Sequence, residues 1–192
     1  MNINPEHRVV LEKIVVAFGN RNIASNWIIA GGVAQNINGL DIETKDIDIL
    51  TDTPTAFLMH EALRDWIVTP MSESSNAIFS SAFGQYLIGT VPIEIAGDLK
   101  IQREVEYHLS IDSFVIKSSK QISVGSAIVN VEPLEESLIA DFVLGRFSRV
   151  DKILEVLRER GVNWEYIEKR VYNSSNPGLL RRRLYELFKC NN

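Results

Sequence analysis

The hydrophobic positions in the first third of the chain change period several times, which predicts short alternating helices and strands. After Asn4-Pro5, apolar residues recur at roughly helical spacing as far as Phe18, and Gly19 ends that pattern. The short apolar run Trp27–Ala30 predicts a strand instead. The next elements predicted are a short helix over 33–38, a strand over 47–50 and a helix over about 55–66.

The middle third is predicted to contain mostly β structure. Residues 70–82 are rich in Ser and Asn and predict a loop, with a weak strand as the alternative. Segments 86–90 and 91–95 are typical of strands, and Ile93-Glu94-Ile95 alternates apolar and polar positions. Segments 111–116 and 122–131 also have β character, and a hairpin turning at 123–126 is expected.

From Pro133 onwards the pattern becomes helical. An apolar face runs from Leu134 to Val143, and amphipathic helices are predicted over 149–160 and 164–172. Asn176-Pro177 predicts the start of a last helix that carries Leu180, Leu184 and Leu187. We therefore expect an α/β (α+β) part over 1–132 and a helical region over 133–192 that packs on it.

Composition narrows the class of protein without naming a function. The chain has 192 residues, 45% of them hydrophobic and 23% charged, which is typical of a globular domain. Its net charge of −5 argues against binding extended nucleic acid by bulk electrostatics. A lone cysteine, Cys190, and no signal-peptide or membrane-spanning pattern lead us to expect a cytoplasmic protein that contacts no membrane.

The candidate chemistry lies between Gly31 and Asp48. In a strand, Asp46 and Asp48 would point to one face while Ile47 and Ile49 point to the core. Two neighbouring carboxylates repel each other unless a cation neutralises them, and Mg²⁺ prefers such oxygen ligands. A Gly31-Gly32 turn at a helix start offers backbone N–H groups to phosphate. Together these features predict a nucleotide site and phosphoryl or nucleotidyl transfer.

Other polar features have plainer interpretations beside the functional ones. The run Arg181–Arg183 would suit RNA, but a solvated helix face next to a leucine stripe explains it as well. His7, His60 and His108 have no spacing typical of a zinc site. The three tryptophans are expected in the core or an interface rather than in a base-stacking platform.

The run Gly31-Gly32, then Thr44-Lys45-Asp46-Ile47-Asp48, then an acid on a later strand resembles the nucleotidyltransferase superfamily of the DNA polymerase β type. The similarity extends to small bacterial and archaeal nucleotidyltransferase-like proteins, including toxin components of two-protein systems. It implies a short mixed sheet flanked by helices, with a helical C-terminal part. It also implies that an NMP group passes from an NTP to a hydroxyl on a small molecule, a protein or an RNA end such as that of tRNA.

The resemblance also implies roles for individual residues. Asp46, Asp48 and Glu94 would hold two Mg²⁺ ions, for which Mn²⁺ could substitute, and Asp98 is a rival for the third acid. The residues implied in nucleotide binding are Gly31, Gly32, Thr44 and Lys45.

Two departures from the family pattern keep an alternative open. Ile42 stands where many members carry Arg, and Asp141 where many carry Lys. Arg146, Arg149 or Lys152 could supply the missing positive charge. The alternative is an inactive nucleotide-binding relative, or one component of a two-protein system with a partner protein.

Overall fold

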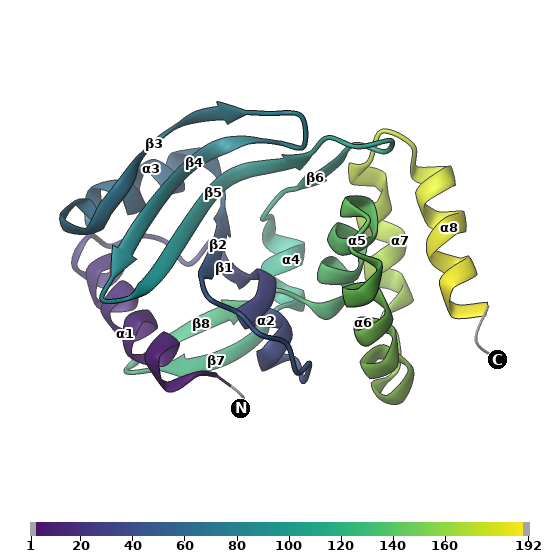
Figure 1. The fold of residues 1–192 in the computed structure, drawn as a ribbon, viewed down its shortest axis with the longest axis horizontal. Helices are drawn as coiled ribbons and strands as arrows, with labels where there is room; N and C mark the ends of the chain where they lie inside the picture. The colour runs from purple at the N-terminus through teal and green to yellow at the C-terminus, as the bar shows by residue number, and fades with distance from the viewer. Residues whose placement is uncertain (1–2, 190–192) are drawn as a thin grey trace.

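A computed structural model describes residues 3–189 and contains one mixed eight-stranded sheet with helices around it (Figure 1). The strand order is β3-β4-β5-β2-β1-β8-β7, and β6 pairs with β5. The strands are β1 (Trp27–Ala30), β2 (Ile47–Thr51), β3 (Ile67–Ser75), β4 (Phe79–Ile88), β5 (Val91–Ile101), β6 (Tyr107–Leu109), β7 (Lys120–Val124) and β8 (Ala127–Val131). The helices are α1 (Pro5–Asn20), α2 (Gly31–Ile37), α3 (Thr53–Ala62), α4 (Ser113–Ser118), α5 (Leu134–Leu144), α6 (Phe147–Arg160), α7 (Trp164–Arg170) and α8 (Pro177–Lys189), with short 3₁₀ turns η1 (Arg64–Trp66) and η2 (Val171–Asn173).

One face of the sheet packs against α1 and α3. Ile29, Ile47 and Ile49 point to this side, where they share a core cluster with Ile14 of α1 and Met59 of α3. All five side chains are fully buried. The alternation of side chains along β2 therefore sends its isoleucines into the core, as the sequence predicts, and leaves Asp48 for the opposite face.

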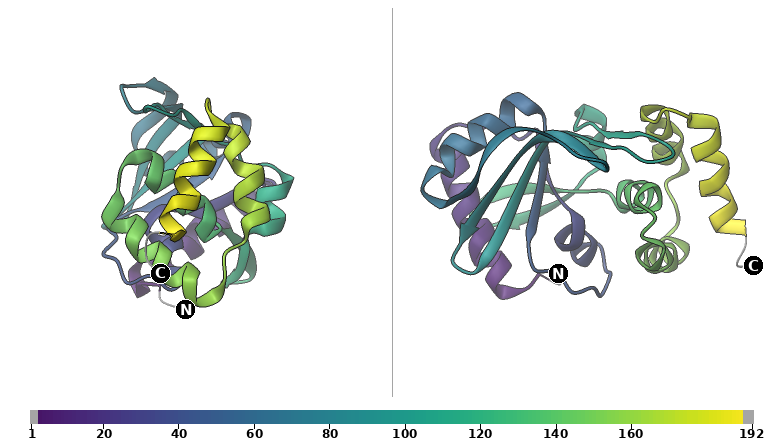
Figure 2. Two further views of the ribbon diagram at one scale, coloured as in Figure 1. Left: turned by 90° about the vertical axis from the view of Figure 1, so that its right-hand side faces the viewer. Right: turned by 45° about the horizontal axis from the view of Figure 1, so that its top comes forward.

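The opposite face looks towards the C-terminal helices, which gather at one end of the molecule (Figures 1 and 2). Ile28 and Leu50 of the sheet belong to one core cluster with Leu138 of α5 and Leu184 of α8. The division into residues 1–132 and 133–192 stays a prediction; it falls at the chain junction between β8 and α5.

A buried ion pair joins α5 to α7. The Arg170 guanidinium donates from Nε to Glu136 Oε2 at 2.7 Å and from Nη2 to Glu136 Oε1 at 2.8 Å. The hydroxyls of Tyr107 and Tyr166 each donate to the same carboxylate at 2.6 Å. Four donors thus satisfy a carboxylate that has lost its water, which is the condition for burying a charge at acceptable cost.

Two segments differ from the sequence-based prediction. Residues 70–82, predicted as a loop with a weak strand as the alternative, form most of β3 and the start of β4. Met71 is the one buried residue of β3, so the strand lacks an apolar alternation and is held by pairing with β4. Residues 111–116, predicted as β structure, lead into helix α4, because the Asp112 side chain accepts the N–H groups of Phe114 and Val115.

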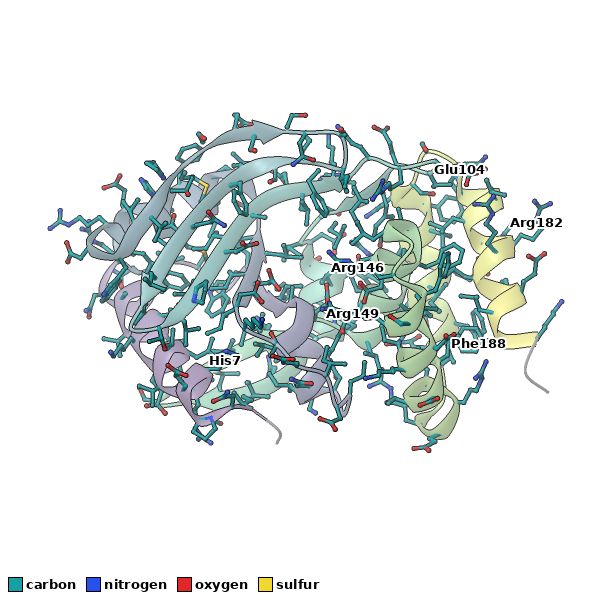
Figure 3. The ribbon with its side chains drawn as sticks, in the orientation of Figure 1. His7, Glu104, Arg146, Arg149, Arg182 and Phe188 are labelled. Atoms are coloured by element: carbon teal, nitrogen blue, oxygen red, sulfur yellow. The ribbon has the colours of Figure 1, made fainter. Side chains whose placement is uncertain are left out.

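The C-terminal arginines are mostly engaged within the fold. Arg181 pairs with Glu168 at 3.2 Å, and Arg183 binds Glu104 through two hydrogen bonds of 2.9 Å. Arg182 points outward from α8 (Figure 3). These contacts favour the solvated-helix interpretation over an RNA-binding one. Cys190 lies outside the described residues.

Across residues 3–189, every helix is too short or too polar to cross a lipid bilayer.

Candidate functional site

The three predicted acidic residues meet at neighbouring strand positions. Asp48 on β2 pairs in register with Glu94 on the parallel strand β5, and with Ala30 on the antiparallel strand β1. Asp46 precedes β2 by one residue. Carboxylate oxygens of Asp46, Asp48 and Glu94 all lie within 4.8 Å of one another. This convergence suits a hard divalent cation, because three carboxylates at such distances otherwise repel.

The rival third acid lies elsewhere. Asp98 sits further along β5, where its Oδ2 accepts the backbone N–H of Thr53 at 2.9 Å. Glu94 instead faces Asp48, and its Oε1 accepts a hydrogen bond from Gln85 Nε2 at 2.9 Å. Position 94 is therefore the one that joins the carboxylate cluster.

The two predicted glycines provide room for this cluster. Gly31 begins α2 with φ of +59°, and a Cβ built on it would lie 1.9 Å from Asp48 Oδ2. A Cβ on Gly32 would lie 2.6 Å from Thr44 Oγ1. Both distances are far below van der Waals contact, so only glycine lets the β1–α2 turn approach Asp48 and Thr44 so closely.

The segment before β2 is held by α2. Asn36 Nδ2 donates to the Ile42 carbonyl at 2.9 Å, while the Ile42 N–H donates to Asn36 Oδ1 at 3.1 Å. Thr44 Oγ1 donates to the Asp46 carbonyl at 3.2 Å. Lys45 is exposed and is not among the residues that line the neighbouring cavity.

The electrostatics of the cluster also favour a cation. Burial, followed by repulsion from Asp46 and Glu94, raises the pKa of Asp48 to about 7, although Arg146 and Arg149 act in the opposite direction. A carboxyl group with a pKa near 7 is only partly ionised at neutral pH in the free protein, and a cation beside it would stabilise the ionised form.

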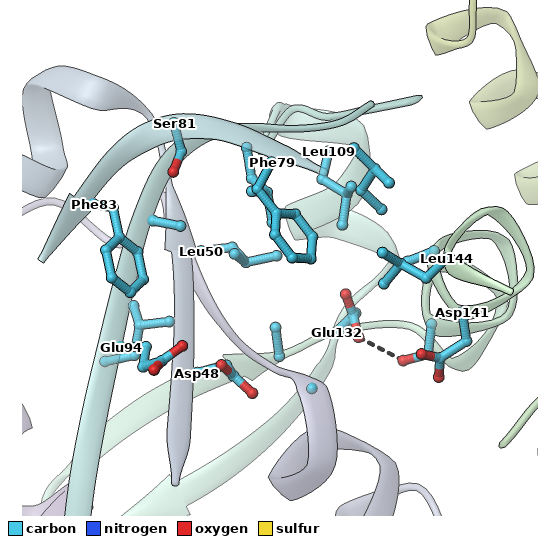
Figure 4. Close-up of a pocket in the computed structure, with 18 of the residues that line it drawn as sticks. Asp48, Leu50, Phe79, Ser81, Phe83, Glu94, Leu109, Glu132, Asp141 and Leu144 are labelled. Carbon is cyan, nitrogen blue, oxygen red and sulfur yellow. Dashed lines mark hydrogen bonds between the residues drawn. The ribbon is translucent and has the colours of Figure 1, made fainter. Parts of the chain in front are cut away.

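A cavity of about 320 Å³ opens over the cluster, a size typical of small-ligand sites. Asp48 and Glu94 lie at one side of it, and Phe79, Phe83 and Leu50 line its apolar wall (Figure 4). Arg146 and Arg149, from the loop after α5 and the first turns of α6, also line it. Both arginines lie on the side of the helical region that faces the sheet (Figure 3). Lys152, the third cation considered, instead donates to the Asp41 carbonyl at 3.1 Å.

Glu132 and Gln35 are among the cavity residues that the sequence-based prediction did not include. Glu132 directly follows β8 and is 3% exposed, and Gln35 on α2 is 2% exposed. Burial raises the pKa of Glu132 to about 8; the carboxylates of Glu136, Asp141 and Asp48 add to the rise, and the Ser137 hydroxyl opposes it. The sequence does show an acid at the end of an apolar run, between Val131 and Pro133. Only the pairing of β8 with β1, however, shows that this acid lies near Asp48.

Comparisons with known proteins identify the fold. No protein-family model matches the chain, and no curated protein matches it. Among solved structures, the "putative nucleotidyltransferase" TM1012 from Thermotoga maritima is similar, with 26% identity and a TM-score of 0.64 over 82% of this chain and 96% of that one.

Two structures of ANT(2'')-Ia are similar in fold. One, in complex with adenylyl-2''-tobramycin, has a TM-score of 0.56 and 13% identity over 93% of this chain and 99% of that one. The other, a solution structure of this antibiotic-resistance factor, has a TM-score of 0.55 and 12% identity over 97% and 95%. With its mixed sheet, flanking helices and helical C-terminal part, the chain has the fold of the nucleotidyltransferase superfamily.

Proposed function

We propose that the protein is a metal-dependent nucleotidyltransferase that moves an NMP group from an NTP to a hydroxyl acceptor. The observation that carries this proposal is the convergence of Asp46, Asp48 and Glu94 within 4.8 Å, next to a glycine turn and under a cavity lined by two arginines. The nucleotidyltransferase fold supports it independently.

The residues divide the work of the transfer between them. Asp46, Asp48 and Glu94 would hold two Mg²⁺ ions, or Mn²⁺ in their place, which would supply Lewis-acid stabilisation of the α-phosphate and of the pyrophosphate leaving group. The acceptor oxygen bonds to the α-phosphorus as the bond from that phosphorus to the α,β-bridging oxygen breaks. Glu94 takes the proton of the acceptor hydroxyl, the role that the family resemblance implies for the third acid.

The triphosphate binds along the start of α2 and beneath α6. Gly31 and Gly32 bring the backbone at the start of α2 close to Asp48 and Thr44, so a phosphate bound by their N–H groups would lie beside the carboxylate cluster. Arg146 and Arg149 replace the cations that the family pattern places at positions 42 and 141. Lys45 contributes only long-range charge, since its side chain is exposed.

The size of the cavity supports a small-molecule acceptor. A volume of about 320 Å³ suits a small molecule better than a protein surface or a folded RNA. The complex of ANT(2'')-Ia with adenylyl-2''-tobramycin is a precedent on this fold for a small hydroxyl acceptor.

Pyrophosphate release from each NTP, with Mg²⁺ and a panel of small hydroxyl compounds, tests the proposal. Release should require the metal and fall at least about 100-fold in the Asp46→Asn/Asp48→Asn variant, because two-metal stabilisation is worth several kcal/mol. Asp151→Asn, which removes an exposed acid of α6, is the matched control. Undiminished turnover in the double variant would refute the site.

A second candidate is a nucleotide-binding relative without transferase activity. Asp141 favours it, because this buried acid stands where many family members carry a lysine. Calorimetry separates the two: NTP binding without pyrophosphate release across the whole panel supports the inactive relative. No nucleotide binding in the presence of Mg²⁺ rejects both candidates.

A further inference from the structure

A fourth carboxyl group, that of Glu132, lies in the same row of the sheet, across neighbouring strands, as Asp48 and Glu94 of the carboxylate cluster. Asp48 pairs with Glu94 on one side and with Ala30 on the other. On the far side of β1, Ile29 pairs with Val131 of the parallel strand β8, so the next residues, Ala30 and Glu132, stand level. The Glu132 N–H donates to the Ile29 carbonyl at 2.8 Å, which continues this pairing past the end of β8.

Residues in one row of a sheet point to the same face, so Glu94, Asp48, Ala30 and Glu132 all line the cavity. With strands roughly 4.8 Å apart, the backbones of Asp48 and Glu132 are roughly 10 Å apart. The single methyl group of Ala30 leaves the space between the two carboxyl groups open. A ligand lying over Ala30 can therefore reach both.

Glu132 is part of a recess of hydrogen-bond acceptors. Its Oε2 accepts the Ser137 hydroxyl, and Asp141 lies on the same side of the cavity (Figure 4). Asp141 Oδ2 accepts Gln35 Nε2 at 2.7 Å, and its Oδ1 accepts Arg146 Nη1 at 3.4 Å, so a ligand cation here shares Asp141 with that arginine. Gln35 Oε1 is buried and has no hydrogen-bond partner within residues 3–189. A buried amide oxygen left without a donor is costly, so this position favours a donor from a bound ligand or an ordered water.

The chemistry of that ligand follows from the recess. Asp141 and the Gln35 amide oxygen accept hydrogen bonds, and a cation placed beside Glu132 favours the ionised form of that carboxyl group, which then accepts as well. The phosphates, sugar and base of an NTP carry no positive charge at neutral pH. Phe79, Leu109 and Leu144 line the same cavity and favour an organic cation over a hydrated metal ion, because Mg²⁺ gives up its water reluctantly.

We propose that Gln35, Glu132 and Asp141 bind a protonated amine of the acceptor, which would make the acceptor a small amino alcohol with an apolar body. The amine lies in the recess, the apolar body lies over Ala30 and along the wall of Phe79 and Leu144, and the hydroxyl reaches the Asp48–Glu94 end. The identity of the bound compound as an acceptor rests on the proposed function; the amine recognition does not.

The test is calorimetry of the full chain without nucleotide or metal, using trans-4-aminocyclohexanol and its neutral counterpart trans-cyclohexane-1,4-diol. The amine should bind at least about ten-fold more tightly than the diol, since charge-assisted hydrogen bonds distinguish the two. Glu132→Gln should abolish this preference, and Asp151→Asn should retain it. Asp141→Asn is the second variant, and melting curves confirm that each variant is folded.

Several outcomes would overturn the amine site. They are no measurable binding of the amine, equal binding of amine and diol, or a preference that survives in both folded recess variants. Displacement of the amine by Mg²⁺ in the Asp46→Asn/Asp48→Asn variant would assign the recess to a metal instead. Because nucleotide and metal are left out, failure here is separate from failure of pyrophosphate release, which tests the transferase activity itself.

Discussion

At the scale of single residues, Gly31 limits how closely the backbone can approach the carboxylate cluster of Asp46, Asp48 and Glu94. A Cβ at this position would lie 1.9 Å from Asp48 Oδ2, and the residue has φ of +59°. Gly31→Ala should therefore push the Asp48 carboxylate aside and weaken Mn²⁺ binding at least about ten-fold, a loss of about 1.4 kcal/mol. Calorimetric titration with Mn²⁺ measures this loss.

Gly39→Ala is the matched control for that experiment. Gly39 also has a positive φ, of +105°, but a Cβ there would meet nothing within 4 Å. Both variants carry the backbone strain of a left-handed alanine, of order 1 kcal/mol, in the free energy of unfolding. Only Gly31→Ala should lose Mn²⁺ affinity. Equal losses in the two variants would show that backbone strain, not close approach, governs the site.

Glu132 gives the stability of the protein a distinctive dependence on pH. Its pKa rises from 4.5 to about 8 on folding, through burial and through Asp48 on β2 and Glu136 and Asp141 on α5. Between these values the folded protein keeps a proton that the unfolded chain has released. The contribution of Glu132 to the free energy of unfolding is therefore greatest below pH 4.5 and falls by about 1.4 kcal/mol per pH unit towards pH 8.

Urea unfolding of the wild type and Glu132→Gln at pH 5.5 and pH 7.5 isolates this contribution. Glutamine does not titrate, so the wild type should lose about 2–3 kcal/mol more than the variant between the two pH values. Asp48 and the other acids titrate in both proteins and largely cancel in the difference. Parallel losses would mean that Glu132 is ionised in the folded protein at pH 5.5.

At the scale of elements, the Glu136–Arg170 pair fixes α7 against α5. Arg170→Met removes one partner and leaves a carboxylate buried among two tyrosines, so the free energy of unfolding should fall by about 3–5 kcal/mol. Arg181→Met breaks the exposed pair with Glu168 and should cost less than about 1 kcal/mol. Denaturant midpoints for the two variants measure the contrast. If Arg170→Met lowered the free energy of unfolding by less than about 1 kcal/mol, as expected for an exposed pair, water would have to reach the Glu136–Arg170 pair.

Most elements could be predicted because their apolar periodicity is local. The strand of Ile47 and Ile49 and the helical region after Pro133 follow from it directly. β3 could not be predicted, since its exposed serines become a strand only through pairing with β4. The apolar residues of α4 suggest β structure, and the Asp112 cap, a local hydrogen bond, decides for the helix.

The residues of the site also divide into those that could be predicted from the sequence and those that could not. Gly31, Gly32, Asp46 and Asp48 lie within one short stretch, so their proximity could be inferred from strand and turn geometry. The proximity of Glu94 to Asp48 depends on the parallel pairing of β2 with β5, which the sequence does not reveal. The family resemblance identified Glu94 instead. For Glu132 and Gln35 there was no such guide, because their meeting depends on β8 lying beside β1 and on α5 covering α2.

At the scale of the whole molecule, the sheet and the helical region share one core. The cluster that holds Ile28 and Leu50 of the sheet also holds Leu138 and Leu180 of the helices. The cavity over the carboxylate cluster lies along this shared boundary, with Asp48 on one side and Arg149 on the other. We therefore propose that the α/β part and the helical region, although distinct in sequence, unfold as one cooperative unit.

Two single-tryptophan proteins test this cooperativity. Trp27→Phe/Trp66→Phe leaves Trp164, which stacks on Tyr185 with ring centroids 4.3 Å apart in the helical region. Trp66→Phe/Trp164→Phe leaves Trp27, which meets Phe18 at 5.4 Å on the far face of the sheet. Within each protein, the urea midpoint from fluorescence should equal the midpoint from far-ultraviolet circular dichroism, because neither part keeps its core without the other. If Trp164 fluorescence changed at lower urea than the dichroism, the helices would leave first, and Arg146 and Arg149 would be lost from the cavity while Asp46, Asp48 and Glu94 were still in place.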